Sequence, residues 1–449
     1  MPFQRRVLIV VSLALCSLVP GELARALDLI GYVPYWEMGS SYTNGTLPAQ
    51  LAMLNEVRYF GLTAGSDGTI TPLSGSGTLQ SHLDRISTLV QKISALPAGQ
   101  RPRLDLTLGG AGEAANFATI AASSTLRTTL AQNISAILSQ TGATAVDIDW
   151  EHPQGATQFN NYGSLLQTIK QQVGSAKRVY ATIDPTVRVP LSVFNGPNAI
   201  DGLSLMTYEL GWWANDPADP NRGEHSLPQY VTDSVDDWTN APGTPNRRPW
   251  VFAQWGLGAQ PQDLGIGLPF FGRVIGTSQS PTAGTPYSYS ELVAGGVPDA
   301  SGNYYTYQGQ TVWVPGPSLA AQRVQFAHDR GLDHMIFWEL GHDVAPTNSK
   351  SLLRAAFLKN ETLSGDYDGD RDIDAADYTV FRMSFGSTSD LRADGNGDGV
   401  VDTADYVVWR SNAPGIGASL SGFVPEPAIS SLLACVSVFL SCVRRPLRC

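Results

Sequence analysis

Short apolar runs alternate with amphipathic, helix-like stretches from about residue 29 to about residue 338 of the chain. The runs are rich in branched and aromatic residues, which is typical of strands buried in a parallel sheet. In the stretch Thr125–Gln140, apolar residues recur at three- and four-residue steps after Ser123 and Ser124, which are good helix caps. The pattern therefore predicts repeated strand–helix units. Eight runs can be assigned: Leu29–Tyr35, Val57–Thr63, Leu104–Leu108, Val146–Trp150, Val179–Ile183, Gly202–Met206, Leu264–Leu268 and Met335–Trp338.

Eight strand–helix units are the number that closes a parallel sheet into a barrel. We therefore predict an α/β fold, a (β/α)8 TIM barrel, over residues 27–360. Barrels of this kind carry their functional side chains at the C-terminal ends of the strands and on the loops that follow. Candidate functional residues are accordingly sought at the ends of the eight runs.

The fourth run ends in three acidic residues, Asp147, Asp149 and Glu151, at alternate positions. Side chains alternate between the two faces of a strand, so these acids are predicted to point together into the barrel. Burial and the proximity of like charges raise the pKa of at least one of them, which keeps a carboxyl group protonated at neutral pH. Glycoside hydrolysis needs such an acid to protonate the leaving oxygen. A solvent-exposed acidic strand end, or a salt-bridge cluster at the base of the barrel, is the alternative interpretation.

The acidic strand resembles the end of the motif Asp-x-x-Asp-x-Asp-x-Glu, which closes the fourth strand of glycoside hydrolase family 18. The resemblance implies that Glu151 is the acid catalyst and that Asp149 orients the acetamido group of the substrate. It also implies that Asp147 shares a proton with Asp149. Thr144 occupies the first acidic position of the motif, so the inner end of the acidic strand is expected to have one proton-sharing partner fewer.

Other segments resemble the same family in the order that the barrel requires, over about residues 28–343. The run Met206–Glu209 resembles the sixth-strand motif, with Glu for the usual Asp, which implies that Tyr208 bonds the acetamido group. The eighth run ends in Trp338, which corresponds to the tryptophan that the family places beneath the sugar at the scission site. The segments Gly31–Trp36, Thr107–Gly110 and Gly267–Arg273 resemble the first, third and seventh strands. The substrate-binding residues implied in this way are Tyr32, Trp36, Met206, Glu209, Arg273 and Trp338.

The family resemblance implies retaining, substrate-assisted hydrolysis of β-1,4-linked N-acetylglucosamine in chitin or a related glycan. The partner is then a polysaccharide or glycan that contains N-acetylglucosamine, and catalysis needs no cofactor. Two alternatives stay open: an endo-β-N-acetylglucosaminidase acting on N-glycans or peptidoglycan, and a catalytically weak chitin-binding lectin. The family often inserts an α+β module between the last two barrel strands, and Tyr287–Tyr307 is predicted to be a reduced remnant that leaves a shallow cleft.

The chain carries a formal net charge of -11 and has a pI of about 5.0. This excludes nucleic acid as the main partner, because phosphate binding needs clustered lysine and arginine. At the N-terminus, Arg5 and Arg6 precede an apolar run and a small-x-small sequence that ends at Ala26, which predicts an export signal over residues 1–26. The cysteines, Cys16, Cys435, Cys442 and Cys449, lie in this signal and in the last residues of the chain, so disulfides are not expected to hold the fold.

Residues 361–412 contain two copies of an acidic loop, each followed by a helix-like run. Oxygen-bearing side chains stand at positions 1, 3, 5, 9 and 12 of each copy, which is the spacing of a calcium loop. Gly399 supplies the sharp turn of the second copy, whereas Arg371 stands at that turn in the first. The pair resembles a type I dockerin, a small helical module, which implies bound Ca²⁺ and a cohesin-like protein partner; a solvated acidic linker is the alternative. The candidate ligands are Asp366, Asp368, Asp370, Asp374, Asp377, Asp394, Asn396, Asp398, Asp402 and Asp405.

Residues 413–424 are predicted to be a linker, and residues 425–449 resemble a PEP-CTERM sorting signal of Gram-negative bacteria. The signal consists of Pro425-Glu426-Pro427, an apolar run and a final basic cluster that begins with Arg444. A stable membrane span needs about 20 apolar residues, and this run is shorter, so transient membrane contact during processing is predicted. A plain C-terminal membrane anchor is the alternative. The two signals imply an exported protein, at the cell surface or outside a Gram-negative-type bacterium.

Overall fold

The computed structural model describes residues 27–210, 225–241, 257–275, 285–297, 303–361, 365–368, 373–388, 390–396 and 399–413. The chain divides into two compact units after Glu361, and each unit is described by itself. The predicted export signal, linker and sorting signal lie outside the described residues, apart from Ala413, as do Asp370 and Asp398. Within the described part of the chain, no helix is both long enough and apolar enough to cross a membrane.

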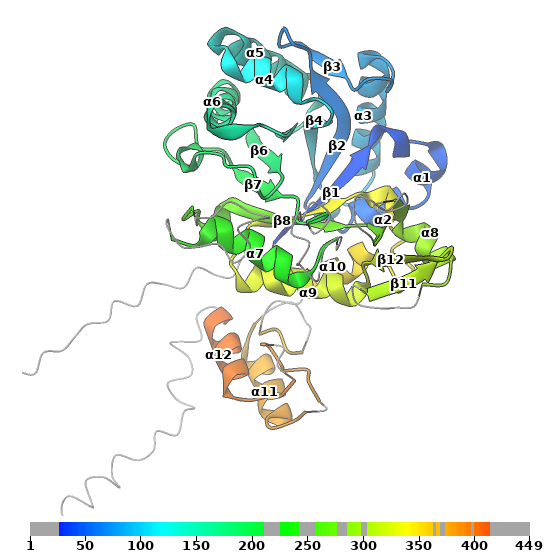
Figure 1. Cartoon of the computed structure of the whole chain (residues 1–449). Helices are drawn as coiled ribbons and strands as arrows, with labels where there is room; N and C mark the ends of the chain where they lie inside the picture. The colour runs from blue at the N-terminus through cyan, green and yellow to red at the C-terminus, as the bar shows by residue number, and fades with distance from the viewer. Residues whose placement is uncertain are drawn as a thin grey trace, which may run out of the picture. The chain divides into compact units, whose positions relative to one another are not determined.

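The first unit is a closed barrel of parallel strands (Figure 1). Strand β1 pairs with β2 on one side and with β13 on the other, which closes the sheet. All eight predicted runs are strands of this barrel, so the predicted (β/α)8 fold is confirmed. The barrel strands are β1 (Asp28–Pro34), β2 (Glu56–Ala64), β4 (Arg103–Ala111), β5 (Ala145–Glu151), β6 (Arg178–Ile183), β7 (Gly202–Leu205), β8 (Leu264–Pro269) and β13 (His334–Trp338), and the short strand β3 (Ile70–Pro72) pairs with β2.

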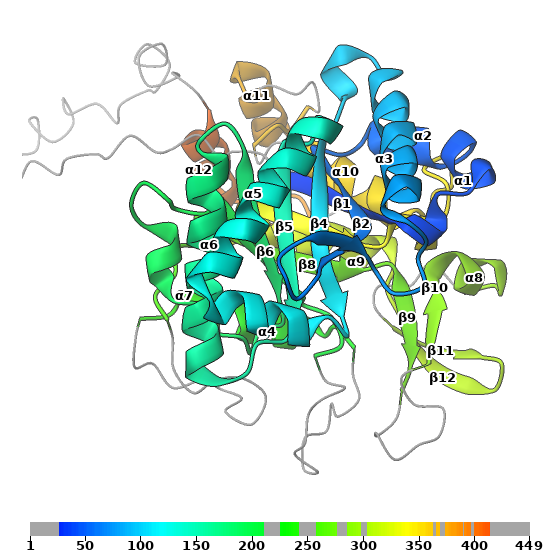
Figure 2. The same ribbon diagram turned by 90° about the horizontal axis from the view of Figure 1, so that it is seen from above.

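Helices surround the barrel and pack their apolar faces against its strands (Figures 1 and 2). Helix α5 (Ser124–Thr141) confirms the predicted helix, and the Ser123 hydroxyl caps it by accepting a hydrogen bond from Leu126 N at 3.3 Å. Its apolar stripe is buried, including Leu130 and Ile134. The other helices of this unit are α1 (Ser40–Asn44), α2 (Leu47–Leu51), α3 (Leu79–Ser94), α4 (Ala114–Ala122), α6 (Gly155–Val173), α7 (Pro228–Thr239), α8 (Tyr289–Ala294), α9 (Pro317–Asp329) and α10 (Leu352–Glu361).

The chain between β8 and β13 forms a separate antiparallel sheet beside the barrel (Figure 2). Strand β9 (Phe271–Val274) pairs with β10 (Pro286–Ser288) and with β12 (Gln310–Val314), and β11 (Asn303–Tyr307) pairs with β12. The predicted remnant Tyr287–Tyr307 is therefore part of a larger four-stranded unit. The prediction did not include the inner strands β9 and β12, and β9 directly continues the apolar run of β8.

The second unit contains two helices, α11 (Ala375–Ser384) and α12 (Thr403–Asn412), each preceded by an acidic loop. Each loop is bonded to the other repeat. The Tyr367 hydroxyl donates to Asp405 O at 2.6 Å, and Trp409 Nε1 donates to Asp374 O at 2.8 Å. The two repeats therefore pack as one unit, whose buried apolar residues are Tyr367, Phe381, Ala393, Val401 and Trp409.

Candidate active site

A cavity of about 550 Å³ opens at the C-terminal ends of the barrel strands. Asp147 lies beneath it with no exposed surface. The structure thus brings together every side chain that the sequence predicts for catalysis and substrate binding. Those that line the cavity are Tyr32, Trp36, Asp149, Glu151, Met206, Tyr208, Glu209, Arg273 and Trp338.

Asp147 is held by hydroxyl groups from three other strands. Its Oδ2 accepts hydrogen bonds from the Tyr32 hydroxyl at 2.8 Å and from Thr107 Oγ1 at 3.1 Å. Its Oδ1 accepts one from Thr182 Oγ1 at 2.9 Å. These bonds occupy both carboxyl oxygens and fix the buried Asp147 side chain below the cavity.

Asp149 and Glu151 lie above Asp147 on the same face of β5 and are electrostatically coupled. Burial, together with the charges of Glu151 and Asp147, raises the pKa of Asp149 well above its usual range. Burial, followed by the charges of Glu209 and Asp184, raises the pKa of Glu151 to about 7. Asp149 Oδ1 is buried and has no hydrogen-bond partner among the described residues. The site thus places a proton donor at neutral pH beside a buried carboxyl oxygen that has no partner among the described residues.

Two glycines at the end of β4 let the chain pass close to this acidic strand. Gly109 has φ +122°, and a Cβ atom there would overlap the backbone oxygen of Asp149. Gly110 has φ +114°, and its Cβ would lie 2.6 Å from Cζ of Phe60. Residues with side chains rarely adopt these backbone angles. Both glycines are therefore required by conformation and by space.

Aromatic rings form one wall of the cavity. Trp338 packs edge-to-face against Tyr32 and Phe60, with ring centroids 5.3 Å and 5.0 Å away. Trp36 is 49% exposed, and its Nε1 donates to Glu339 Oε1 at 3.0 Å. Sugar rings stack their C–H faces on such aromatic surfaces, so these rings provide a platform for a saccharide.

The opposite wall carries Tyr208, Glu209 and Arg273. A Cβ atom on Gly267 would lie 2.6 Å from the Tyr208 ring, so the ring packs closely on that glycine. Glu209 adopts a left-handed backbone conformation with φ 62° and forms an ion pair with Arg273. Its carboxylate is therefore engaged by a cation at the edge of the cavity.

A model of the glycosyl hydrolases family 18 matches residues 29–343, which contain the whole barrel and this cavity. The chain belongs to this family. Among family 18 relatives, it is 23% identical over 352 residues to Endochitinase 1 of Metarhizium robertsii, a match that covers 70% of this chain and 80% of the relative. It is 24% identical over 349 residues to Chitinase 1 of Aphanocladium album, covering 69% of this chain and 80% of the relative.

The family 18 fold is also shared with a class V chitinase from Nicotiana tobaccum, solved in complex with NAG4. The TM-score is 0.56 at 15% sequence identity, and the match covers 74% of this chain and 98% of that structure. This similarity supports the barrel fold.

Sequence analysis missed three residues of this family 18 site: Arg58, Thr182 and Asp184. Thr182 contacts Asp147 from near the end of β6, and Arg58 contacts it from near the start of β2. Asp184, which lines the cavity, follows the end of β6. The strand-end rule could have found Asp184, but Arg58 lies within an apolar run that carries no such signal. Thr144 donates to Asp105 Oδ1 at 3.1 Å, a carboxyl at the base of the barrel.

The described residues contain two groups that could hold a metal ion. Asp366, Asp368 and Asp377 of the first acidic loop have ligand oxygens within 4.8 Å of one another. In the second loop, Gly399 has φ +88°, as the predicted turn requires. Beside the cleft, Glu37, Glu339 and His342 form the other group.

In each acidic loop, the last two candidate ligands also form a capping box at the start of a helix. The pairs are Asp374 with Asp377, and Asp402 with Asp405. Asp405 Oδ1 also accepts from Asn396 N at 3.0 Å, and Asp394 Oδ2 accepts from Gly399 N at 2.9 Å. These bonds fold each loop back on itself and hold the carboxylates close together.

Proposed function

We propose that this protein hydrolyses β-1,4-linked N-acetylglucosamine in chitin by a retaining, substrate-assisted mechanism. The observation that carries the proposal is the setting of Asp149. Asp149 lines the cavity between Asp147 and Glu151, and its buried Oδ1 has no hydrogen-bond partner among the described residues. The N–H of a substrate acetamido group is the donor that such an oxygen lacks. The names of the relatives and of the similar structure support chitin as the substrate.

In the first step of the proposed reaction, the acetamido carbonyl oxygen attacks C1 of the sugar. Glu151 gives its proton to the glycosidic oxygen as the bond between C1 and that oxygen breaks. The resulting oxazolinium ion is positively charged, and its N–H faces Asp149 while the Tyr208 hydroxyl donates to its ring oxygen. Glu151, now a carboxylate, takes a proton from the water that attacks C1. The ring opens and the original configuration is restored.

Oligosaccharides with and without the acetamido group test this proposal. We expect cleavage of N-acetylchitotetraose and none of cellotetraose, because cellotetraose has no internal nucleophile. Proton NMR within the first minutes should show the β-anomer as the first product. Comparable cleavage of both substrates, or an α-anomer as the first product, would exclude the mechanism. Preferential cleavage of N-glycans or peptidoglycan would instead favour the endo-β-N-acetylglucosaminidase alternative.

The pH dependence of hydrolysis should follow Glu151. The catalyst must carry its proton, and its pKa is raised to about 7, so kcat/KM should be constant below that pH. Above it, kcat/KM should fall about tenfold per pH unit, because the protonated fraction falls by that factor. Stopped assays with N-acetylchitotetraose at closely spaced pH values measure this limb. A rate that rises steadily with pH would contradict the assignment of Glu151 as the acid.

We further propose that residues 361–412 form a calcium-binding, dockerin-like module. The proposal is supported by the clustered carboxylates of the first loop and by the repeated spacing, which supplies the hard oxygen ligands that Ca²⁺ prefers. Exposed apolar side chains, Met383 and Val407, are consistent with docking onto a cohesin-like protein.

Calorimetry on the full protein should detect calcium binding in this module. Asp394→Asn removes a charged ligand from position 1 of the second loop and is expected to weaken one site at least about tenfold. Asp390→Asn is the matched control, because Asp390 is an exposed residue outside the ligand positions that pairs with Arg392. Equal calcium affinities in Asp394→Asn and Asp390→Asn would rule out the second loop as a site.

Export through residues 1–26 and sorting through residues 425–449 are also proposed, on the basis of the sequence patterns. Fractionation of expressing cells and mass spectrometry of the mature chain should find both segments removed. A chain that keeps its C-terminal segment in the membrane fraction would favour the plain anchor.

A further inference from the structure

Arg58 is a fully buried cation beneath the acidic strand. It lies on β2, and its Nη1 atom is 3.5 Å from Asp147 Oδ1. The same nitrogen donates to the Tyr32 hydroxyl at 2.9 Å and lies 3.2 Å from Ser204 Oγ. The reaction steps proposed above do not use this charge, although it contacts the same carboxylate that underlies the cavity.

The positive charge of Arg58 is balanced by Asp147 and by the acids Asp105 and Glu56 at the base of the barrel. Its Nε and Nη2 atoms have no hydrogen-bond partner among the described residues. Its guanidinium lies over the Tyr180 ring at 4.7 Å. Burial is the largest single effect and opposes the charged form, but the negative charges of Asp147 and of several other neighbours together outweigh it, so the pKa of Arg58 is raised. A buried cation is retained only where anions balance it.

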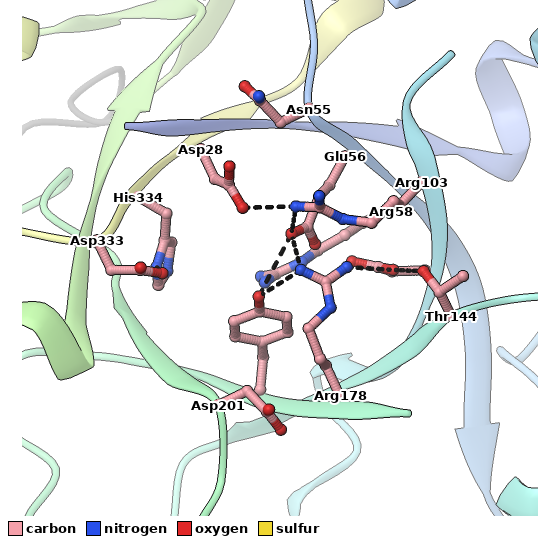
Figure 3. Close-up of polar contacts among 12 residues, drawn as sticks. Asp28, Asn55, Glu56, Arg58, Arg103, Thr144, Arg178, Asp201, Asp333 and His334 are labelled. Atoms are coloured by element: carbon pink, nitrogen blue, oxygen red, sulfur yellow. Dashed lines mark hydrogen bonds and ion pairs between the residues drawn. The ribbon is translucent and has the colours of Figure 1, made fainter. Parts of the chain in front are cut away.

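The other cations of the barrel base are paired away from the acidic strand. Figure 3 shows the side chains of Glu56, Arg103 and Arg178 converging between the strand starts. Arg103 pairs with Asp28 and with Glu56 at 2.6 Å, and Arg178 pairs with the same glutamate. Among the described arginines and lysines, Arg58 forms the ion pair with Asp147. It therefore connects the base of the barrel to the active site.

We propose that Arg58 is a positioning residue for the hydrolysis: it holds the Asp147 carboxyl group and the Tyr32 hydroxyl in place and sets a positive charge beneath the neighbouring acids Asp149 and Glu151. This inference rests on the proposed function. Thr144 leaves the acidic strand without a fourth carboxyl, and Arg58 stabilises its inner end with a cation instead. Arg58 also opposes the rise in the pKa of Asp149 that burial and the charges of Glu151 and Asp147 cause.

Three variants test the proposal through the pH profile of hydrolysis. Arg58→Met removes the cation, so the protons of the coupled pair Asp149 and Glu151 should be held to higher pH. We expect the alkaline limb of the pH profile of kcat to shift to higher pH by about one unit. We also expect kcat to fall about 100-fold, with KM little changed. Arg58→Lys keeps the charge and should return the limb to its wild-type position.

Arg178→Met is the matched control, because it removes the same charge from the same buried cluster without contacting Asp147. It should lower the melting temperature and leave the alkaline limb in place. An unmoved limb in Arg58→Met, or an equal shift in Arg178→Met, would overturn the proposal. Circular dichroism spectra of all variants establish that they are folded.

A measurement without substrate separates this proposal from the proposed function. In Arg58→Met, the buried Asp149 loses a cation that lowers its pKa, so ionisation of Asp149 costs more folding free energy. The melting temperature of the variant should therefore fall more at about pH 9 than at about pH 5, and adding Asp149→Asn should remove that difference. Equal losses at both pH values would contradict the link. If the wild type cleaves none of the oligosaccharides, the proposed function fails while this result still decides the role of Arg58.

Discussion

Replacing Glu151 by glutamine is expected to lower kcat for N-acetylchitotetraose by about 10³- to 10⁴-fold, the upper part of the range for loss of a general acid. Glutamine has nearly the same shape as glutamate but cannot donate a proton to the glycosidic oxygen. Binding should survive, because the aromatic wall formed by Trp338 and Trp36 is unchanged. Stopped-time assays and calorimetry with the same tetrasaccharide measure the two effects separately.

Glu113→Gln provides the comparison for this result. Glu113 also lines the cavity, from the segment after β4, but it accepts a hydrogen bond from Thr63 Oγ1 at 3.1 Å and has no role in the proposed reaction. Its replacement should therefore change kcat only a few-fold. Binding without turnover in both the wild type and Glu151→Gln would favour the lectin alternative. Turnover by Glu151→Gln at the wild-type rate would show that another group supplies the proton.

Gly109→Ala is expected to destabilise the barrel by about 3 kcal/mol and to abolish most of the activity. The added methyl group would overlap the backbone oxygen of Asp149. Strands β4 and β5 are paired within the closed barrel, so neither can move away to make room. The displaced backbone would carry the Asp149 side chain with it. Urea denaturation measures the free energy of unfolding, and the oligosaccharide assay measures the loss of activity.

Gly112→Ala is the matched control, three residues further along the same segment. Gly112 also has a left-handed backbone, with φ +93°, but nothing lies within 4 Å of its Cβ position. This variant should lose only about 1 kcal/mol, the cost of the backbone conformation alone. Equal losses in the two variants would show that the close approach of β4 to β5 is not what requires Gly109.

The barrel was predictable from the sequence because each strand is a continuous apolar run that is buried on both faces. The acids of β5 were predictable for a related reason, since polar residues that interrupt such a run at alternate positions need a functional or structural explanation. Thr107 and Tyr32, which lie in segments that resemble the family, both contact Asp147 in the structure.

The inner support of the site was not predictable in this way. Thr182 and Asp147 lie on the paired strands β6 and β5, whereas Arg58 lies on β2, which β4 separates from β5. Curvature of the sheet into a barrel brings Arg58 to Asp147. A single arginine within the run Val57–Thr63 gives no indication of the residue that it will face. The inner strands β9 and β12 of the four-stranded sheet beside the barrel were not predicted either, and β9 directly continues the apolar run of β8.

Hydrogen bonds run in both directions between the two acidic repeats, so each repeat holds the other in place. Trp409 of the second repeat donates a hydrogen bond to the backbone oxygen of Asp374 in the first. Tyr367 of the first repeat donates one to the backbone oxygen of Asp405 in the second. A half-length copy would leave its aromatic residues without a place to pack. Occupancy of one loop should consequently favour occupancy of the other, and a chain cut between them should lose both at once.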